Sequence, residues 1–202
     1  PINEPPSNHL HGEICSRAWE VLEYGVSEQQ GAYVTSTFHY RKHPDILAYF
    51  PHELSFTVTY SLVNGTLQME TKVMNEGVDE APFAFGLHPY FILPFEQEEE
   101  LVLTVPAANE WTVTNEAFVV GEPAITAFSE ELNNGVNIAN YPPLGCSLVS
   151  LKNEDHLCQI DVKNQGYSLM YQLDKQFPFV LLFRPNWASA FSLEPYTYVT
   201  DA

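Results

Sequence analysis

Basic residues are scarce in this chain. Lysine and arginine together number 8 against 26 aspartates and glutamates, which gives a formal net charge of −18 over 202 residues. That charge repels phosphate backbones and anionic lipid, so nucleic-acid binding and membrane-surface binding are disfavoured. A strongly anionic substrate would need a local group of cations, and the basic residues here are scattered along the sequence. A neutral small-molecule ligand fits this composition better.

Cysteines are few and long apolar runs are absent. Cys15, Cys146 and Cys158 fit neither a disulfide framework nor a zinc-ligand spacing, and their odd number favours a reducing compartment. No apolar run is long enough to span a membrane, and no signal-like charged and then apolar start is present. We therefore expect a soluble, cytoplasmic protein. The chain opens at Pro1 without a methionine, which is compatible with a longer N-terminus.

Motifs that hold phosphates or metals are absent as well. There is no glycine-rich phosphate loop, no Gly-x-Ser-x-Gly elbow and no HExxH helix. His9 and His11 would point the same way in a strand, but a stable zinc site needs three or four ligands and no further ligand cluster lies at a recognisable spacing. We expect no metal. His39 and His43, in the stretch FHYRKHPD, are interpreted as exposed loop residues.

The dipeptide Asn64-Gly65 is the clearest local structure signal. It separates two alternating runs, residues 54–63 and 66–73, and supplies the two positive-φ residues of a type I′ hairpin turn. A two-residue loop fixes the register, so residue 63 faces residue 66. One face of the hairpin is then apolar and is expected to lie on a core. The facing pairs on it are Phe56/Val73, Val58/Thr71, Tyr60/Met69 and Leu62/Leu67.

Short β-rich segments recur elsewhere, and none shows a sustained apolar period of 3.6 residues. They are residues 18–24, 32–40, 82–88, 100–106, 146–151, 167–173, 179–183 and 190–196. Fifteen prolines and repeated Asn/Gly turns fit many short, evenly spaced strands. With 45% hydrophobic residues and neither linker nor repeat, the chain is predicted to be a single all-β domain over residues 1–202, an antiparallel sandwich or a barrel-like structure.

Two distant segments each place a proton-transfer group directly before a proline. His88 precedes Pro89 and Glu194 precedes Pro195, and a residue before proline is held in an extended conformation. A histidine and a glutamate fixed in this way provide what a general acid and base need. His88 shares a strand face with Gly86, which leaves space for a ligand, or marks a bulge or a close crossing of backbones. Taken singly, a structural histidine and a surface glutamate are the commoner interpretations.

Four landmarks, in this order, resemble the aldose 1-epimerase (galactose mutarotase-like) family. They are NHLHG with a following Trp-Glu-Val (8–12 and 19–21), the hairpin sequence that ends in PFAFGLHPYF (54–91), the strand FPFVLLFRP (177–185) and LEPYT (193–197). The resemblance implies a β-sandwich of the large supersandwich type, with a sugar bound in an open concave cleft. Family members usually carry further strands at both ends, so we expect a fragment or a trimmed variant that lacks terminal strands.

The resemblance also implies roles for individual residues. Glu194 matches the family's base, His88 its principal acid, and His11 the second histidine, which contacts the ring oxygen. Asn8 and Arg17 are expected to bind the sugar. The reaction implied is the interconversion of the α and β anomers of a free aldohexose by ring opening, which needs no cofactor. The anionic Glu194 is expected to raise the pKa of His88 and so to keep it protonated.

Two other functions stay open from the sequence. A hexose-6-phosphate epimerase of the same superfamily would need a cluster of basic side chains for the phosphate, and arginines are scarce. A carbohydrate-binding relative would keep the fold and lose the reaction. Cys15, where many relatives carry an arginine, favours that second alternative, whereas the joint presence of His11, His88 and Glu194 opposes it.

Overall fold

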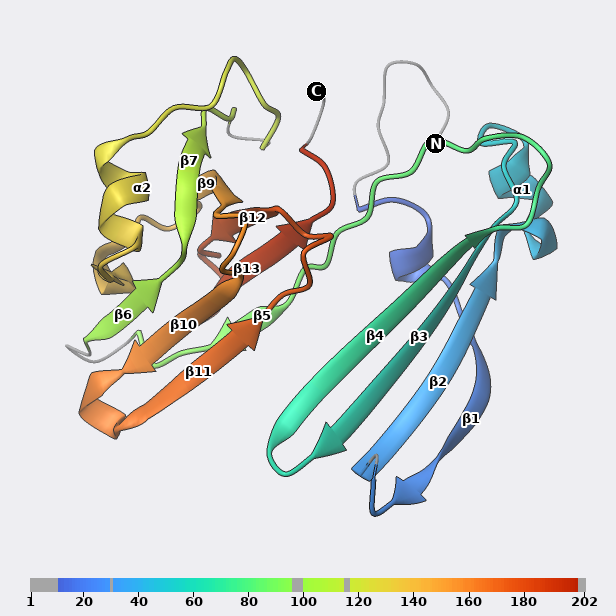
Figure 1. Ribbon diagram of the computed structural model, residues 1–202, viewed down its shortest axis with the longest axis horizontal. Coiled ribbons are helices and arrows are strands. Elements are labelled where there is room, and N and C mark those ends of the chain that lie inside the picture. Colours follow the sequence, from blue (N-terminus) through green and yellow to red (C-terminus); the bar gives the residue numbers. More distant parts are fainter. Residues whose placement is uncertain (1–10, 30, 96–99, 115–116, 200–202) are drawn as a thin grey trace. The chain divides into compact units, whose positions relative to one another are not determined.

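The computed structural model describes residues 11–29, 31–95, 100–114 and 117–199 (Figure 1). The chain forms two compact units, Pro1–Pro82 and Phe83–Ala202. Both are built from antiparallel strands, which confirms the predicted all-β class. That the whole of 1–202 acts as one domain stays a prediction. No helix among the described residues is long and apolar enough to cross a membrane.

The first unit is one four-stranded sheet in the order β1-β2-β3-β4. Its strands are β1 (Glu20–Ser27), β2 (Gly31–His39), β3 (Leu54–Val63) and β4 (Thr66–Asn75). Short helical segments precede β1 and connect β2 to β3, namely η1 (Ile14–Ser16), η2 (Tyr40–Lys42) and α1 (Pro44–Leu47). The four strands run side by side in Figure 1.

The predicted hairpin and its register are confirmed. β3 and β4 pair with Val63 opposite Thr66, and the facing pairs down the strands are those expected. Asn64 and Gly65 have φ values of 50° and 77°, the left-handed conformation that a type I′ turn requires at both positions.

The apolar face of this hairpin is buried only toward the end away from the turn. Phe56 is buried, with its ring centroid 5.5 Å from that of Tyr40 in η2. Nearer the turn, Tyr60, Leu62 and Leu67 are exposed. The expectation that this face lies on a core thus holds for Phe56 and Val58 but not for the residues near the turn in the described first unit.

The second unit is a two-layer arrangement of sheets. One sheet has the order β5-β13-β12-β9-β7 and the other β11-β10-β6-β8. The elements are β5 (Tyr90–Ile92), β6 (Leu101–Thr104), β7 (Ala107–Trp111), α2 (Ala127–Leu132), β8 (Val136–Asn137), η3 (Ile138–Asn140), β9 (Cys146–Leu151), β10 (Leu157–Val162), η4 (Lys163–Gln165), β11 (Tyr167–Gln172), β12 (Phe179–Phe183) and β13 (Ala190–Tyr196). The helix α2 lies beside β7 (Figure 1).

The main core of the second unit draws buried side chains from both sheets. Leu103 and Ile160 come from one sheet, and Leu182, Phe191 and Leu193 from the other. All five are at most 1% exposed. Burying such a side chain contributes about 1.5–3 kcal/mol relative to leaving it in water, so this layer holds the two sheets together.

The segment 82–88 departs from the sequence prediction, because it forms no continuous strand. It makes one isolated bridge, between Gly86 and Tyr196, and it also receives a backbone hydrogen bond from Thr197, whose N–H lies 2.9 Å from the oxygen of Phe85. Pro82 begins the segment and Pro89 follows it, and neither has an N–H to donate to a ladder, so regular pairing cannot extend past either end.

Candidate functional site

Strand β13 divides its side chains between two faces. Phe191 and Leu193 enter the main core. Glu194 pairs with Leu181 on β12, and Leu181 in turn pairs with Leu148 on β9, which places these three side chains on the opposite face of the sheet. Leu148 and Leu181 form a second, smaller cluster there. Glu194 therefore emerges beside apolar side chains, and it is only 3% exposed.

The irregular segment before β5 brings His88 to the same place. The N–H of Leu87 donates to the oxygen of Pro195 at 3.1 Å, which fastens this segment to the end of β13. The Nδ1 atom of His88 then lies 3.4 Å from Oε1 of Glu194, and the histidine side chain is 30% exposed. Two groups 106 positions apart in the sequence thus form a contact pair with one buried member and one partly exposed member.

Three further side chains of the second unit complete the surroundings of this pair. The hydroxyl of Tyr196 donates to Oε2 of Glu194 at 2.7 Å. The Oγ of Ser192 lies 3.2 Å from Nδ1 of His88. The ring of Tyr90 stacks on the imidazole with centroids 4.8 Å apart. Both carboxylate oxygens and one ring nitrogen are therefore held by named partners.

Gly86 provides the room that Tyr196 occupies. A Cβ added to this glycine would lie 2.5 Å from Cδ1 and 2.8 Å from Cε1 of the Tyr196 ring, closer than real side chains approach one another. Of the interpretations open from the sequence, the close crossing of backbones is the one observed, since Gly86 forms a bridge with Tyr196. The small residue two positions before His88 lets the tyrosine pack against this segment and reach Glu194.

The electrostatics of the site differ from the sequence expectation at His88. Burial lowers the pKa of His88 and outweighs a hydrogen bond with the backbone that raises it. The prediction that Glu194 raises this pKa is therefore wrong, since desolvation of the imidazolium dominates. Glu194 does act on its other neighbours. Burial and then the negative charge of Glu194 raise the pKa of Tyr196, and the same two causes raise that of Cys146 to about 11.

Ser192, Tyr196 and Tyr90 have no assigned role in the sequence prediction. The alternation of β13 does place Ser192 and Tyr196 on the face of Glu194, two residues to either side. That signal is available in the sequence, but it does not say which of the two reaches the carboxylate. Tyr90 follows His88 by two residues and could have been found by the same rule.

The remaining predicted site residues belong to the first unit. His11 is exposed in a turn, with a left-handed φ of 63°. Arg17 is held by carboxylates: one of its terminal nitrogens lies 2.7 Å from Glu13 and 2.7 Å from Asp45. Asn8 lies outside the described residues. The structure thus joins His88 to Glu194, while a sugar-binding role for Arg17 and Asn8 and the convergence of His11 on the pair stay predictions.

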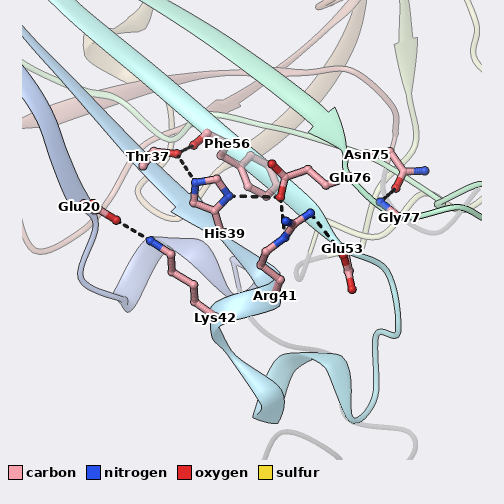
Figure 2. A network of polar contacts seen from close by, with 10 residues as sticks. All are labelled: Glu20, Thr37, His39, Arg41, Lys42, Glu53, Phe56, Asn75, Glu76 and Gly77. Atoms are coloured by element: carbon pink, nitrogen blue, oxygen red, sulfur yellow. Dashed lines mark hydrogen bonds and ion pairs between the residues drawn. The ribbon is translucent and has the colours of Figure 1, made fainter.

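The interpretation of His39 as an exposed loop residue is wrong. It is the last residue of β2, and its Nδ1 lies 3.2 Å from Oε2 of Glu76, which also forms an ion pair with Nε of Arg41 at 2.9 Å (Figure 2). Burial raises the pKa of Glu76, but the hydrogen bond from His39 and the charge of Arg41 prevail and leave it lowered. His43 does lie in a connection, with its ring half-buried and stacked 4.4 Å from that of Phe38. Both histidines therefore make contacts within the first unit, His39 with Glu76 and His43 with Phe38.

Residues that could bind a metal are not grouped in the described parts of the chain. No cluster of three or more His, Cys, Asp or Glu side chains is placed there to hold an ion. The chemistry that the pair can perform is proton transfer, because it joins a buried carboxylate to an imidazole with a lowered pKa.

The protein is all-β, and a histidine and a glutamate are in contact on the face of a sheet that points away from the main core. This combination is typical of proteins that perform acid and base chemistry. The sequence matches the aldose 1-epimerase family over residues 1–198. The chain therefore belongs to the aldose 1-epimerase family, and this confirms the resemblance seen in its motifs.

Solved structures agree with this assignment. A galactose mutarotase-like protein from Clostridium acetobutylicum superposes with a TM-score of 0.85 and 26% identity, covering 100% of this chain and 62% of that one. A galactose mutarotase-like protein from Lactobacillus casei ATCC 334 gives a TM-score of 0.73 at 23% identity, covering 89% of this chain and 62% of that one. Both support the mutarotase-like sandwich fold.

Curated relatives show a similar range of sequence identity. The uncharacterized protein YphB of Escherichia coli (strain K12) is 22% identical over 212 residues, which cover 100% of this chain and 65% of that protein. The uncharacterized protein YihR of the same strain is 29% identical over 120 residues, or 58% of this chain and 36% of that protein. The chain thus spans less than two thirds of the length of each of these relatives.

Proposed function

We propose that the protein is an aldose 1-epimerase that interconverts the α and β anomers of a neutral, free aldohexose. The observation that carries this proposal is the contact of 3.4 Å between Nδ1 of His88 and Oε1 of Glu194, in a chain that belongs to the aldose 1-epimerase family. Anomer exchange requires one group that accepts a proton and one that donates it. These two residue types supply both functions without a cofactor.

In the proposed reaction Glu194 removes the proton of the C1 hydroxyl while His88 protonates the ring oxygen. The bond between C1 and the ring oxygen breaks, and an open-chain aldehyde forms. Rotation about the C1–C2 bond then presents the other face of the carbonyl. Ring closure returns one proton to His88 and one from Glu194 to the new C1 hydroxyl, so both residues end the cycle as they began it. His11 is proposed as a second contact to the ring oxygen.

The lowered pKa of His88 suits the acid step and limits it at the same time. An imidazolium of lower pKa gives up its proton more readily to a weakly basic ether oxygen. A smaller share of the molecules carries that proton at neutral pH, however, so the active form becomes more abundant as the pH falls. The pH at which activity declines is thus a direct readout of the role of His88.

The arginines already have partners within the protein, and this favours a neutral sugar over a sugar phosphate as the substrate. Arg17 is paired with Glu13, and Arg41 with Glu76. Arg184 donates to backbone carbonyl oxygens and lies 4.2 Å from the centroid of the Phe95 ring. All three arginines of the chain are therefore engaged with protein groups, and a phosphate would have to displace one of those partners.

Polarimetry tests the proposal directly. Freshly dissolved α-glucose and α-galactose are followed with the wild-type protein, with Glu194→Gln, and with Glu130→Gln as a matched control. Glu130 is an exposed glutamate of α2 in the same unit. We expect the wild type and the control to accelerate equilibration and Glu194→Gln to lose that acceleration. Acceleration restricted to a 6-phosphate would instead establish the phosphate epimerase, and sugar binding without turnover would establish a binding protein.

A further inference from the structure

Ser192 lies between His88 and the backbone that follows it. The serine side chain is fully buried on β13, with 0% of its surface exposed. Its Oγ lies 2.7 Å from the carbonyl oxygen of Pro89 and 3.2 Å from Nδ1 of His88. A single hydroxyl therefore bridges the imidazole and the peptide group of the next residue.

The direction of both hydrogen bonds follows from counting protons. A carbonyl oxygen has no proton to give, so the Ser192 hydroxyl must donate its one proton to Pro89. The serine oxygen can then only accept from Nδ1 of His88, which requires that Nδ1 carry a proton. The second neighbour of Nδ1 agrees, because Oε1 of the Glu194 carboxylate, at 3.4 Å, is also an acceptor.

We propose that Ser192 is a positioning residue that fixes neutral His88 as the tautomer with its proton on Nδ1, so that Nε2 is the nitrogen that gains and loses the catalytic proton. A neutral imidazole otherwise has a choice of two tautomers, and hydrogen bonding at one nitrogen selects which is populated. In the proposed reaction the imidazolium gives its Nε2 proton to the ring oxygen and keeps the Nδ1 proton. Ring closure then returns the proton to Nε2.

The contribution of Ser192 can be sized from one hydrogen bond. A neutral intramolecular hydrogen bond shifts an equilibrium by roughly tenfold, so Ser192→Ala should change the ratio of the two neutral tautomers of His88 by about that factor. The contact with Glu194 is retained in this variant and continues to favour Nδ1–H. We therefore expect a measurable admixture of the other tautomer rather than a complete inversion.

Nuclear magnetic resonance measures the tautomer without any need for activity. Long-range proton–nitrogen correlation of the ¹⁵N-labelled protein, at a pH where the imidazole is neutral, distinguishes the protonated nitrogen from the unprotonated one. The resonances of His88 are assigned by their loss in His88→Gln. Ser147→Ala is the matched control, since Ser147 lies in the same sheet and its hydroxyl accepts from Tyr141 rather than His88.

The wild-type spectrum is expected to show the proton on Nδ1 and the unprotonated resonance at Nε2, with the ratio lowered in Ser192→Ala and unchanged in Ser147→Ala. A wild-type His88 with its proton on Nε2 overturns the proposal, and so does a ratio that Ser192→Ala leaves unchanged. The wild-type measurement stands by itself if the alanine variant does not fold.

Only the kinetic consequence rests on the proposed epimerase function. In the polarimetric assay Ser192→Ala is expected to lower kcat by at most about twofold, in proportion to the fraction of His88 that leaves the Nδ1–H tautomer, and to leave KM unchanged. An Nδ1–H tautomer in a protein that accelerates no anomer exchange upholds the role of Ser192 and refutes the proposed function. An active enzyme whose His88 carries its proton on Nε2 upholds the proposed function and refutes the role of Ser192.

Discussion

Replacing Gly86 by alanine is expected to disturb the site through a single contact. The added Cβ would lie 2.5 Å from the ring of Tyr196, whereas ordinary contact begins at 3.4 Å, so the ring must move by about 1 Å. Overpacking of this kind typically costs about 1–3 kcal/mol. The shift also draws the tyrosine hydroxyl away from Oε2 of Glu194, which it reaches at 2.7 Å. We expect a loss of about 2 kcal/mol in the free energy of unfolding.

Urea unfolding of a double-mutant cycle checks this value. Gly77→Ala is the control, because its nearest contact is a side-chain oxygen at 3.3 Å in the first unit and it should change stability little. In a Tyr196→Ala background the cost of Gly86→Ala should largely disappear, since the clashing ring is gone. If Gly86→Ala is as well tolerated as Gly77→Ala, or if its cost is the same with and without the ring, the reasoning about this contact is refuted.

Three other changes give distinct readouts. Tyr196→Phe removes a donor from the carboxylate of Glu194, and the loss of such a charge-assisted hydrogen bond should reduce kcat about tenfold in polarimetry; an unchanged kcat would contradict the contact. The log of kcat/KM should fall as the pH rises, with a midpoint below the usual histidine value of about 6.5, because burial lowers the pKa of His88; a midpoint above it contradicts the acid role. Arg17→Met leaves the buried Glu13 without its cation and should lower the free energy of unfolding by about 2 kcal/mol, which moves the urea midpoint to a lower concentration; equal midpoints would show the pair to be dispensable.

Local signals in the sequence predict many of the strands of this fold, although not β10 (Leu157–Val162). Asn64-Gly65 specifies its turn within two residues, and the register of both neighbouring strands follows from it. The segments 146–151, 179–183 and 190–196 are strands with the predicted bounds, since alternation and β-branched or aromatic residues act over a few neighbours.

Features that depend on distant parts of the chain are less readable. The segment 82–88 carries a strand-like pattern, but its partners, Pro195 to Thr197, lie more than a hundred residues away, and Pro82 and Pro89 at its ends have no N–H with which to extend the pairing. In the hairpin at 54–73 the apolar residues extend along both strands, but only those away from the turn are buried. Burial depends on which other elements cover the face, and the local pattern does not specify them.

Some features of the candidate site can also be predicted from the sequence, whereas others depend on distant contacts. Residue type and the following proline single out His88 and Glu194 in the sequence. The sign of the pKa shift at His88 is not accessible there, because it depends on how deeply the imidazole is buried. Ser192 and Tyr196 acquire their roles only when β13 meets the segment before β5.

The acceleration of anomer exchange by wild-type protein, set against that by Glu194→Gln, is the most direct test of the proposed proton transfer. The variant keeps the shape of the side chain and its neighbour Tyr196, but it removes the group that accepts the proton. Wild-type protein should bring freshly dissolved α-glucose or α-galactose to equilibrium faster than the spontaneous reaction, and Glu194→Gln should not. Equal acceleration by both proteins, or none by the wild type with any common aldose, would contradict the proposed function.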